Sequence, residues 1–279
     1  MSVLSGSIVR ALSGGDEAMA ITITAVLAIT AGVVLVAIGL LRLGWVAQFL
    51  SEPIVTGFVA GLVVLIVVGE IPGLAGISAP TGDIFQRIDE TVRGLEDFHA
   101  LTLAVGVGSL AILFGGSRLL PKAPWSLIVL VGGIVLSSTL DLAARGVHVV
   151  GEVPTGLPLP SVPVVDVQLW SGIVTGGLAI AAVGIAEGLA AVRTFAPSGG
   201  VDPDSDNQEF VGHGAANLAS GIFGGMGVGG SLSKTAANAR AGAYTQVSGV
   251  AASLVVLLFV AFAAGLLTNL PRAVLSAIV

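Results

Sequence analysis

The sequence contains no cysteine and little charge: Asp, Glu, Lys and Arg make up only 10% of its 279 residues. Soluble globular domains carry about 25% charged residues, so this composition does not supply the surface of a soluble enzyme. The absence of cysteine excludes disulfides, thiolate metal sites and cysteine nucleophiles. The 11 basic residues form no run, which argues against a surface that follows nucleic-acid phosphates. We therefore expect no nucleic-acid partner, and no residue cluster suggests a cofactor or a metal.

Apolar residues and glycine dominate the chain instead. Hydrophobic residues account for 54% of it, the mean hydropathy is +1.02, and 40 residues are glycine. Small residues allow the backbones of membrane helices to approach closely. This composition is typical of an integral multi-pass membrane protein surrounded by lipid.

Long runs without charge predict six membrane-spanning helices. These runs cover residues 18–41, 53–69, 100–117, 123–140, 167–192 and 245–267, and the fifth is interrupted by one acid. At about 1.5 Å per residue, the first run would be ~36 Å long, enough to cross a hydrocarbon core of about 30 Å. The fold class is therefore predicted to be an all-α polytopic membrane protein. Residues 70–99, 141–166 and 195–207 are expected to be polar connections.

A glycine-rich break interrupts the region after residue 207. The segment Gln208–Phe223 is apolar enough to enter a membrane, but GGMGVGG at 224–230 cannot continue as a stable helix. Each glycine costs a helix about 1 kcal/mol relative to alanine. A polar helical pattern then starts at Ser231 and extends through residue 246. This order predicts a discontinuous membrane helix, which is where transporters place their binding sites.

The predicted helix start has the chemistry of an anion site. A helix N-terminus exposes unpaired N–H groups and carries about half a positive charge. Lys234 adds a full positive charge in the first turn, where it opposes the helix dipole unless an anion lies between them. The predicted substrate-binding residues are Gly230, Ser231, Leu232, Ser233 and Lys234, and Asn238 is a candidate for the cavity lining. Alternatively, Lys234 reaches water or pairs with an acid.

Glu187 is the acid that interrupts the fifth predicted span. A carboxylate within a membrane is costly, and such residues usually mark a transport pathway or a proton relay. We therefore assign Glu187 a proton-coupling role as a hypothesis. Gly184 and Gly188 flank it at helical spacing and would let the helix of residue 234 approach. The alternative is that Glu187 lies hydrated at the end of its span.

Five stretches, in order along the chain, resemble motifs of the SulP family of sulfate permeases and related anion transporters. They are LRLGWVAQFLSEPIVTGFVAGL (41–62), GEVPTGLPLPSVP (151–163), EGLAAVRTFA (187–196), GGSLSKTAANARAGAYTQVSG (229–249) and LLTNLPRAVLSAIV (266–279). These motifs occur in the correct order and are spread across nearly the whole chain, which makes the match specific.

The resemblance implies a transporter of fourteen spans, built as two inverted seven-helix repeats with a core domain and a gate domain. The anion would lie between the N-termini of two half-length helices, the third and the tenth. On this template the chain begins inside the third helix and ends inside the twelfth, so we expect it to be truncated at both ends and to lack a STAS domain. Residues 1–42 and 169–268 would belong to the core, and residues 53–142 and 272–279 to the gate.

The expected function is secondary active transport of a small anion, such as sulfate, bicarbonate or a dicarboxylate, by proton-coupled alternating access. The resemblance also implies a bacterial cell membrane as the location and allows a homodimer. An anion channel or exchanger of the same family and a non-transporting structural subunit stay open as alternatives. An intramembrane protease built from Ser231 or Ser233 with His213 is disfavoured, because GGSL at 229–232 lacks the usual G-x-S-G turn. We therefore expect no enzyme activity.

Overall fold

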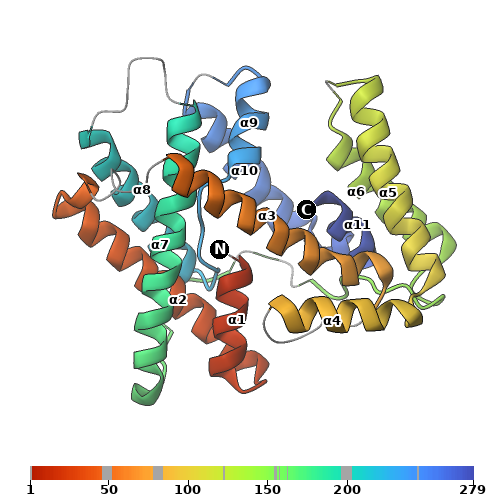
Figure 1. Ribbon diagram of the computed structural model, residues 1–279, viewed down its shortest axis with the longest axis horizontal. Coiled ribbons are helices and arrows are strands. Elements are labelled where there is room, and N and C mark those ends of the chain that lie inside the picture. Colours follow the sequence, from red (N-terminus) through yellow and green to blue (C-terminus); the bar gives the residue numbers. More distant parts are fainter. Residues whose placement is uncertain are drawn as a thin grey trace. The chain divides into compact units, whose positions relative to one another are not determined.

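The computed structural model describes residues 2–45, 52–77, 84–121, 123–153, 156, 158–161, 163–195, 203–243 and 245–279. Over these residues the chain is helical, apart from one isolated bridge between Val149 and Pro271 (Figure 1). The α-helices are α1 (Ser2–Ser13), α2 (Glu17–Leu40), α3 (Glu52–Ala75), α4 (Ile84–Gly94), α5 (Ala100–Leu119), α6 (Trp125–Leu140), α7 (Trp170–Phe195), α8 (Pro203–Ile222), α9 (Leu232–Arg240), α10 (Val247–Phe262) and α11 (Arg272–Ile278). Three short 3-10 helices of the described residues are η2 (Leu95–Asp97), η3 (Val167–Leu169) and η4 (Ala264–Asn269). The predicted all-α fold class is confirmed.

Each of the six predicted spans forms a helix, but their lengths differ from one another. The helices α2 and α5, and α7 together with η3, are long and apolar enough to cross a membrane. The apolar helices α6 and α10 have 16 residues each, which corresponds to only about 24 Å. The sequence therefore predicted too many full-length spans, because α6 and α10 are shorter than the roughly 20 residues that a spanning helix needs.

Two predicted boundaries are wrong. The helix α3 continues past Glu70 and Pro72 to Ala75, where a polar connection was expected. Its last turn is held by tertiary packing, because Leu74 lies against Gly106 of α5. The helical pattern that starts at Ser231 ends at Arg240, and a new helix begins at Val247.

The chain divides into two compact units, each made of two separate segments. The first unit contains Met1–Val59 and Pro158–Ala251, and the second contains Ala60–Leu157 and Ala252–Val279. Two of the three divisions between the units fall inside α3 and α10, and the third lies between α6 and η3. Which unit corresponds to which transporter domain stays a prediction.

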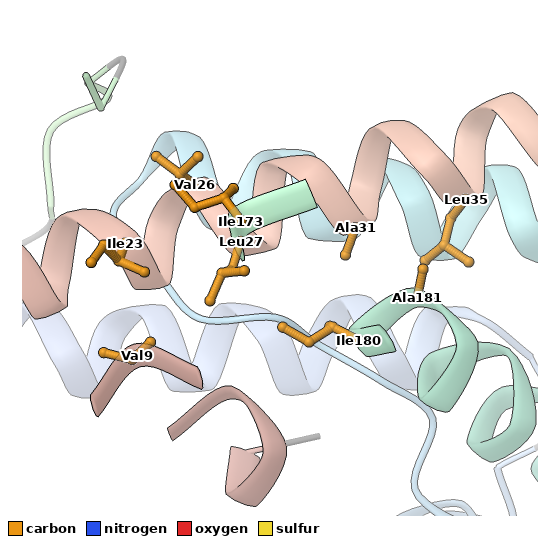
Figure 2. Close-up of a cluster of buried hydrophobic side chains, with 9 residues drawn as sticks. All are labelled: Val9, Ile23, Val26, Leu27, Ala31, Leu35, Ile173, Ile180 and Ala181. Atoms are coloured by element: carbon orange, nitrogen blue, oxygen red, sulfur yellow. The ribbon is translucent and has the colours of Figure 1, made fainter. Parts of the chain in front are cut away.

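The centre of the first unit is the packing of α2 against α1, α7 and α8. The N-cap of α2 is Asp16, whose side chain accepts a hydrogen bond from the Met19 N–H at 3.0 Å. Within α2, no charged residue follows Glu17. Figure 2 shows the buried cluster that this packing produces: Val9, Ile23, Val26, Leu27, Ala31, Leu35, Ile173, Ile180 and Ala181. Because α2 is apolar on all sides, it can contact several helices at once.

Glycines allow α2 and α8 to cross with their backbones nearly in contact. A Cβ atom on Gly32 would lie 2.8 Å from the Gly214 carbonyl oxygen, and one on Gly214 would lie 2.7 Å from the Val36 nitrogen. A Cβ atom on Gly221 would lie 2.6 Å from the Ala25 carbonyl oxygen. Such close approach is the usual role of small residues between membrane helices. The close packing against α2 makes α8 a firm support for the glycine break that follows it.

In the second unit, α11 packs against α5 and α6, and Val129, Leu270 and Val274 form its buried cluster. Backbone hydrogen bonds hold the start of α11 to the segment that follows α6, since the Arg272 N–H donates to the His148 carbonyl at 2.9 Å. The Val150 N–H likewise donates to the Leu270 carbonyl at 2.9 Å. The second unit therefore has a core of its own.

We predict that Gly214→Ala destabilises the protein in detergent micelles. The added methyl group would force α8 away from α2, and overpacking of this kind costs about 1–3 kcal/mol. The control is Gly212→Ala on the same helix, where an added Cβ meets nothing within 4 Å. A thermal unfolding curve should show a midpoint lowered by a few degrees for Gly214→Ala only. Equal midpoints for the two variants would contradict this account of the crossing.

Candidate functional site

The glycine break separates α8 from α9, as the sequence predicted. The helix α8 ends at Ile222, and Gly224 adopts a positive φ of 72° that turns the chain out of the helix. Residues 225–230 then have no regular structure. Ser231 is the N-cap of α9, with extended backbone angles and a side-chain oxygen that accepts the Lys234 N–H at 3.4 Å. A nine-residue helix therefore begins directly after the glycines.

The glycine before this helix start lies against α7. A Cβ atom on Gly230 would lie 2.8 Å from the Gly188 Cα and 3.2 Å from the Glu187 carbonyl oxygen. Real Cβ atoms do not approach other heavy atoms that closely, so this contact needs glycine at position 230. The half-buried Glu187 is consequently a neighbour of the helix start in space, although 43 positions separate Glu187 from Gly230 in the sequence.

Lys234 lies in the first turn of α9 and its side chain is exposed. An ion pair joins Arg93 to Asp89 on α4. Among the described residues, no carboxylate lies within ion-pair distance of Lys234. Leu232 and Ser233 form the remainder of the first turn, and their side chains lie outside the described part of the structure. The first turn therefore combines backbone N–H groups that have no partner within the helix with a cationic side chain.

The candidate cavity-lining residue Asn238 makes its hydrogen bond away from the first turn of α9. The exposed Asn238 donates a side-chain hydrogen bond to the Ser248 hydroxyl at 3.1 Å, and this bond joins α9 to the start of α10. His213 on α8 packs its imidazole against Gly188, with its Cε1 3.1 Å from the position of a Cβ on that glycine. Gly188 is thus contacted by α8 as well as by the segment that precedes α9.

Sequence reasoning missed Asn217, a completely buried side chain on α8. Its amide forms hydrogen bonds with the backbone of Val228, in the middle of the glycine break. An asparagine inside an apolar run was the available signal, because a buried amide requires partners. The sequence alone does not say that those partners belong to the break.

The arrangement has the chemical properties of a site for a small anion. Peptide N–H groups at the first turn of α9, the positive end of its helix dipole and the Lys234 ammonium all favour negative charge. The glycines at 229 and 230 add no side chain that would block the approach to the helix end. The described residues contain no group of three or more His, Cys, Asp or Glu side chains that could hold a metal ion.

Comparison with known proteins places this geometry in context. The model of the sulfate permease family matches residues 1–279. A probable sulfate transporter of Mycobacterium tuberculosis is 29% identical over 278 residues, covering 100% of this chain and 50% of the relative. The bicarbonate transporter BicA of Synechocystis is 28% identical over 283 residues, covering 100% of this chain and 49% of the relative.

The fold is similar to that of a solved anion transporter. The structure of the murine Solute Carrier 26 family member A9 in its inward-facing state has a TM-score of 0.88 and 26% identity, and the match covers 99% of this chain and 49% of that one. The chain spans about half the length of the curated relatives that it matches. It is an integral membrane protein, and the family consists of anion transporters and not of enzymes: the chain belongs to the sulfate permease family.

Proposed function

We propose that this protein transports a small oxyanion across a bacterial cell membrane and binds it at the N-terminus of α9. The observation that carries the proposal is the start of α9 directly after a glycine packed against α7, with a lysine in its first turn. Sulfate and bicarbonate are the first candidates, because two relatives are described as transporters of these anions. A dicarboxylate is a third candidate, since its carboxylate groups have the same charge and acceptor geometry.

The physical basis of the proposed site is that a bound anion removes the repulsion between Lys234 and the positive end of the α9 dipole. A lysine near a helix N-terminus is repelled by the positive end of the dipole, and such interactions amount to about 0.3–1 kcal/mol at exposed sites. An anion that accepts hydrogen bonds from the N–H groups of the first turn, with the Lys234 ammonium beside it, removes this repulsion. The positive groups of the site would thereby favour the loaded state.

The movement would be that of one unit against the other. Glu187, the glycine break and α9 all belong to the first unit, which we assign to the core domain. The second unit would then be the gate domain, and alternating access would move the core and its anion relative to that gate. This assignment follows the predicted division of residues 1–42 and 169–268 from residues 53–142 and 272–279, with two exceptions: residues 53–59 belong to the first unit and residues 252–268 to the second.

Proton coupling through Glu187 completes the proposal. Glu187 is half-buried within α7, and its backbone carbonyl lies beside Gly230. In this proposal the carboxylate on this turn of α7 senses the charge of an anion bound at the start of α9. Protonation of Glu187 and anion binding would then favour each other, which is the thermodynamic requirement for symport.

We predict that Lys234→Ala raises the KM for sulfate or bicarbonate uptake about tenfold. Hydrogen bonds to charged groups contribute about 1.5–3 kcal/mol, and each 1.4 kcal/mol corresponds to a factor of ten in affinity. The measurement is uptake of radiolabelled sulfate and bicarbonate by the natural protein in proteoliposomes. Lys234→Arg keeps the charge and should stay within a few-fold of the natural KM.

Arg240→Ala is the second control for this experiment, because it removes the same charge from the other end of the same helix. It should leave the KM nearly unchanged. A KM for Lys234→Ala equal to that of the natural protein, for both anions, would exclude the start of α9 as the binding site.

Glu187→Gln is predicted to abolish anion accumulation driven by a pH gradient while leaving anion exchange intact. Glutamine has a similar shape but cannot take up or release a proton, so binding would continue without the coupled ion. The assay compares uphill uptake under an inward proton gradient with exchange of labelled for unlabelled anion at equal pH, and Glu187→Asp serves as the control that still titrates. Persistent uphill uptake by Glu187→Gln would leave Glu187 without a coupling role. Absence of uphill uptake by the natural protein itself would favour an exchanger or a channel.

A further inference from the structure

The amide side chain of Asn217 is paired with the backbone of the glycine break. Its carbonyl oxygen accepts the Val228 N–H at 2.9 Å, and its amino group donates to the Val228 carbonyl at 2.8 Å. The same amino group donates to the His213 carbonyl, one turn earlier on α8, at 2.9 Å. Three hydrogen bonds thus hold a side chain with 0% exposure.

This pairing resembles the contact between two β-strands. In an extended segment, the N–H and C=O groups of one residue point to the same side, and a neighbouring strand bonds to both. Asn217 supplies the same donor and acceptor from a helix. The orientation of its amide is fixed by its partners, because the two carbonyls need donors and the Val228 N–H needs an acceptor. Among uncharged side chains of this size, only a carboxamide presents both groups at this spacing.

The rest of the break is held on the same helix and against α7. The Ser220 hydroxyl donates to the Met226 carbonyl at 2.6 Å, and the Gly225 N–H donates to the Ser220 carbonyl at 2.7 Å. On the other side, a Cβ atom on Gly227 would lie 3.2 Å from the Ile180 side chain on α7. The break therefore contacts both α7 and α8.

Val228, which Asn217 binds, lies close to the start of α9. Val228 lies between Gly227 and Gly229, and glycine permits more backbone conformations than any other residue. Only two residues, both glycine, separate Val228 from the N-cap Ser231. A fixed Val228 and the Gly230 contact with Gly188 together determine where α9 begins.

We propose that Asn217 is a positioning residue for anion binding: its carboxamide fixes the glycine break on α8 and thereby sets the place and direction of the α9 N-terminus. The inference rests on the proposed anion site at α9. The support itself is rigid, because α8 crosses α2 through Gly214 and Gly221 with their backbones in close approach. Asn217 touches no substrate and acts through Val228.

The first test measures anion affinity separately from turnover. Asn217→Leu preserves the approximate volume but leaves both backbone groups of Val228 without their partner. We expect the KM for sulfate uptake in proteoliposomes to rise about tenfold or more, with a smaller change in kcat. Asn217→Gln retains the carboxamide on a longer side chain and should give an intermediate KM. Ser220→Ala, which removes a bond from α8 to Met226 further from Ser231, should change the KM less than Asn217→Leu.

The second test observes the break directly and needs no transport. Because the chain has no cysteine, a single cysteine can carry a spin label without any background substitution. A label on Val228→Cys, whose side chain is partly exposed, should become more mobile when Asn217→Leu is added. A label on Ala219→Cys, an exposed position of α8, should not change and so shows that α8 is still folded.

The outcomes separate the two proposals. A mobile label at 228 with a raised KM supports the positioning role. An unchanged label at 228, or a mobile label with an unchanged KM while Lys234→Ala does raise it, overturns that role and leaves the anion site intact. If Lys234→Ala also leaves the KM unchanged, the anion site itself fails and the positioning role fails with it.

Discussion

The close approach of Gly230 to Gly188 is the contact on which the arrangement of the candidate site depends. A single methyl group at position 230 would lie 2.8 Å from the Gly188 Cα, so the two backbones meet because residue 230 has no side chain. This contact brings the start of α9 to the backbone of Glu187. The proposed anion site and the backbone of Glu187 are neighbours for this reason, although the two belong to different helices.

The same principle is repeated across the first unit. Glycines on α2 and α8 allow their crossing, and further glycines on α7 accept Leu27 and Thr30 from α2. Lipid tails are as apolar as leucine, so burial provides little drive for helices to associate in a membrane, and close packing has to supply it. A composition rich in glycine therefore stabilises α2, α7 and α8 as one body. The irregular segment at 224–230 can be tolerated because it packs against this body and because Asn217 and Ser220 bind several of its backbone groups.

The sequence was sufficient for features that depend on local chemistry. The break at 224–230 and the start of α9 at Ser231 follow from the backbone freedom of glycine and from serine capping, which act within a few residues. Features that depend on tertiary contacts were not predictable in this way. Proline at position 72 normally ends a helix, yet α3 continues because Leu74 packs on Gly106. The partner of Asn217 lies eleven residues away across a turn of the chain, and no local pattern identifies it.

The two kinds of feature have different functions in the site. Lys234 and the N–H groups of α9 supply positive charge, and their residue types alone state this. Their position relative to Glu187 comes from Asn217 on one side and Gly188 on the other, neither of which carries a charge. A helix dipole decays within the first turn, so a displacement of a few ångströms would separate the anion from the charges that favour it. In the proposed anion site, the uncharged residues that hold the helix would therefore set the affinity together with Lys234.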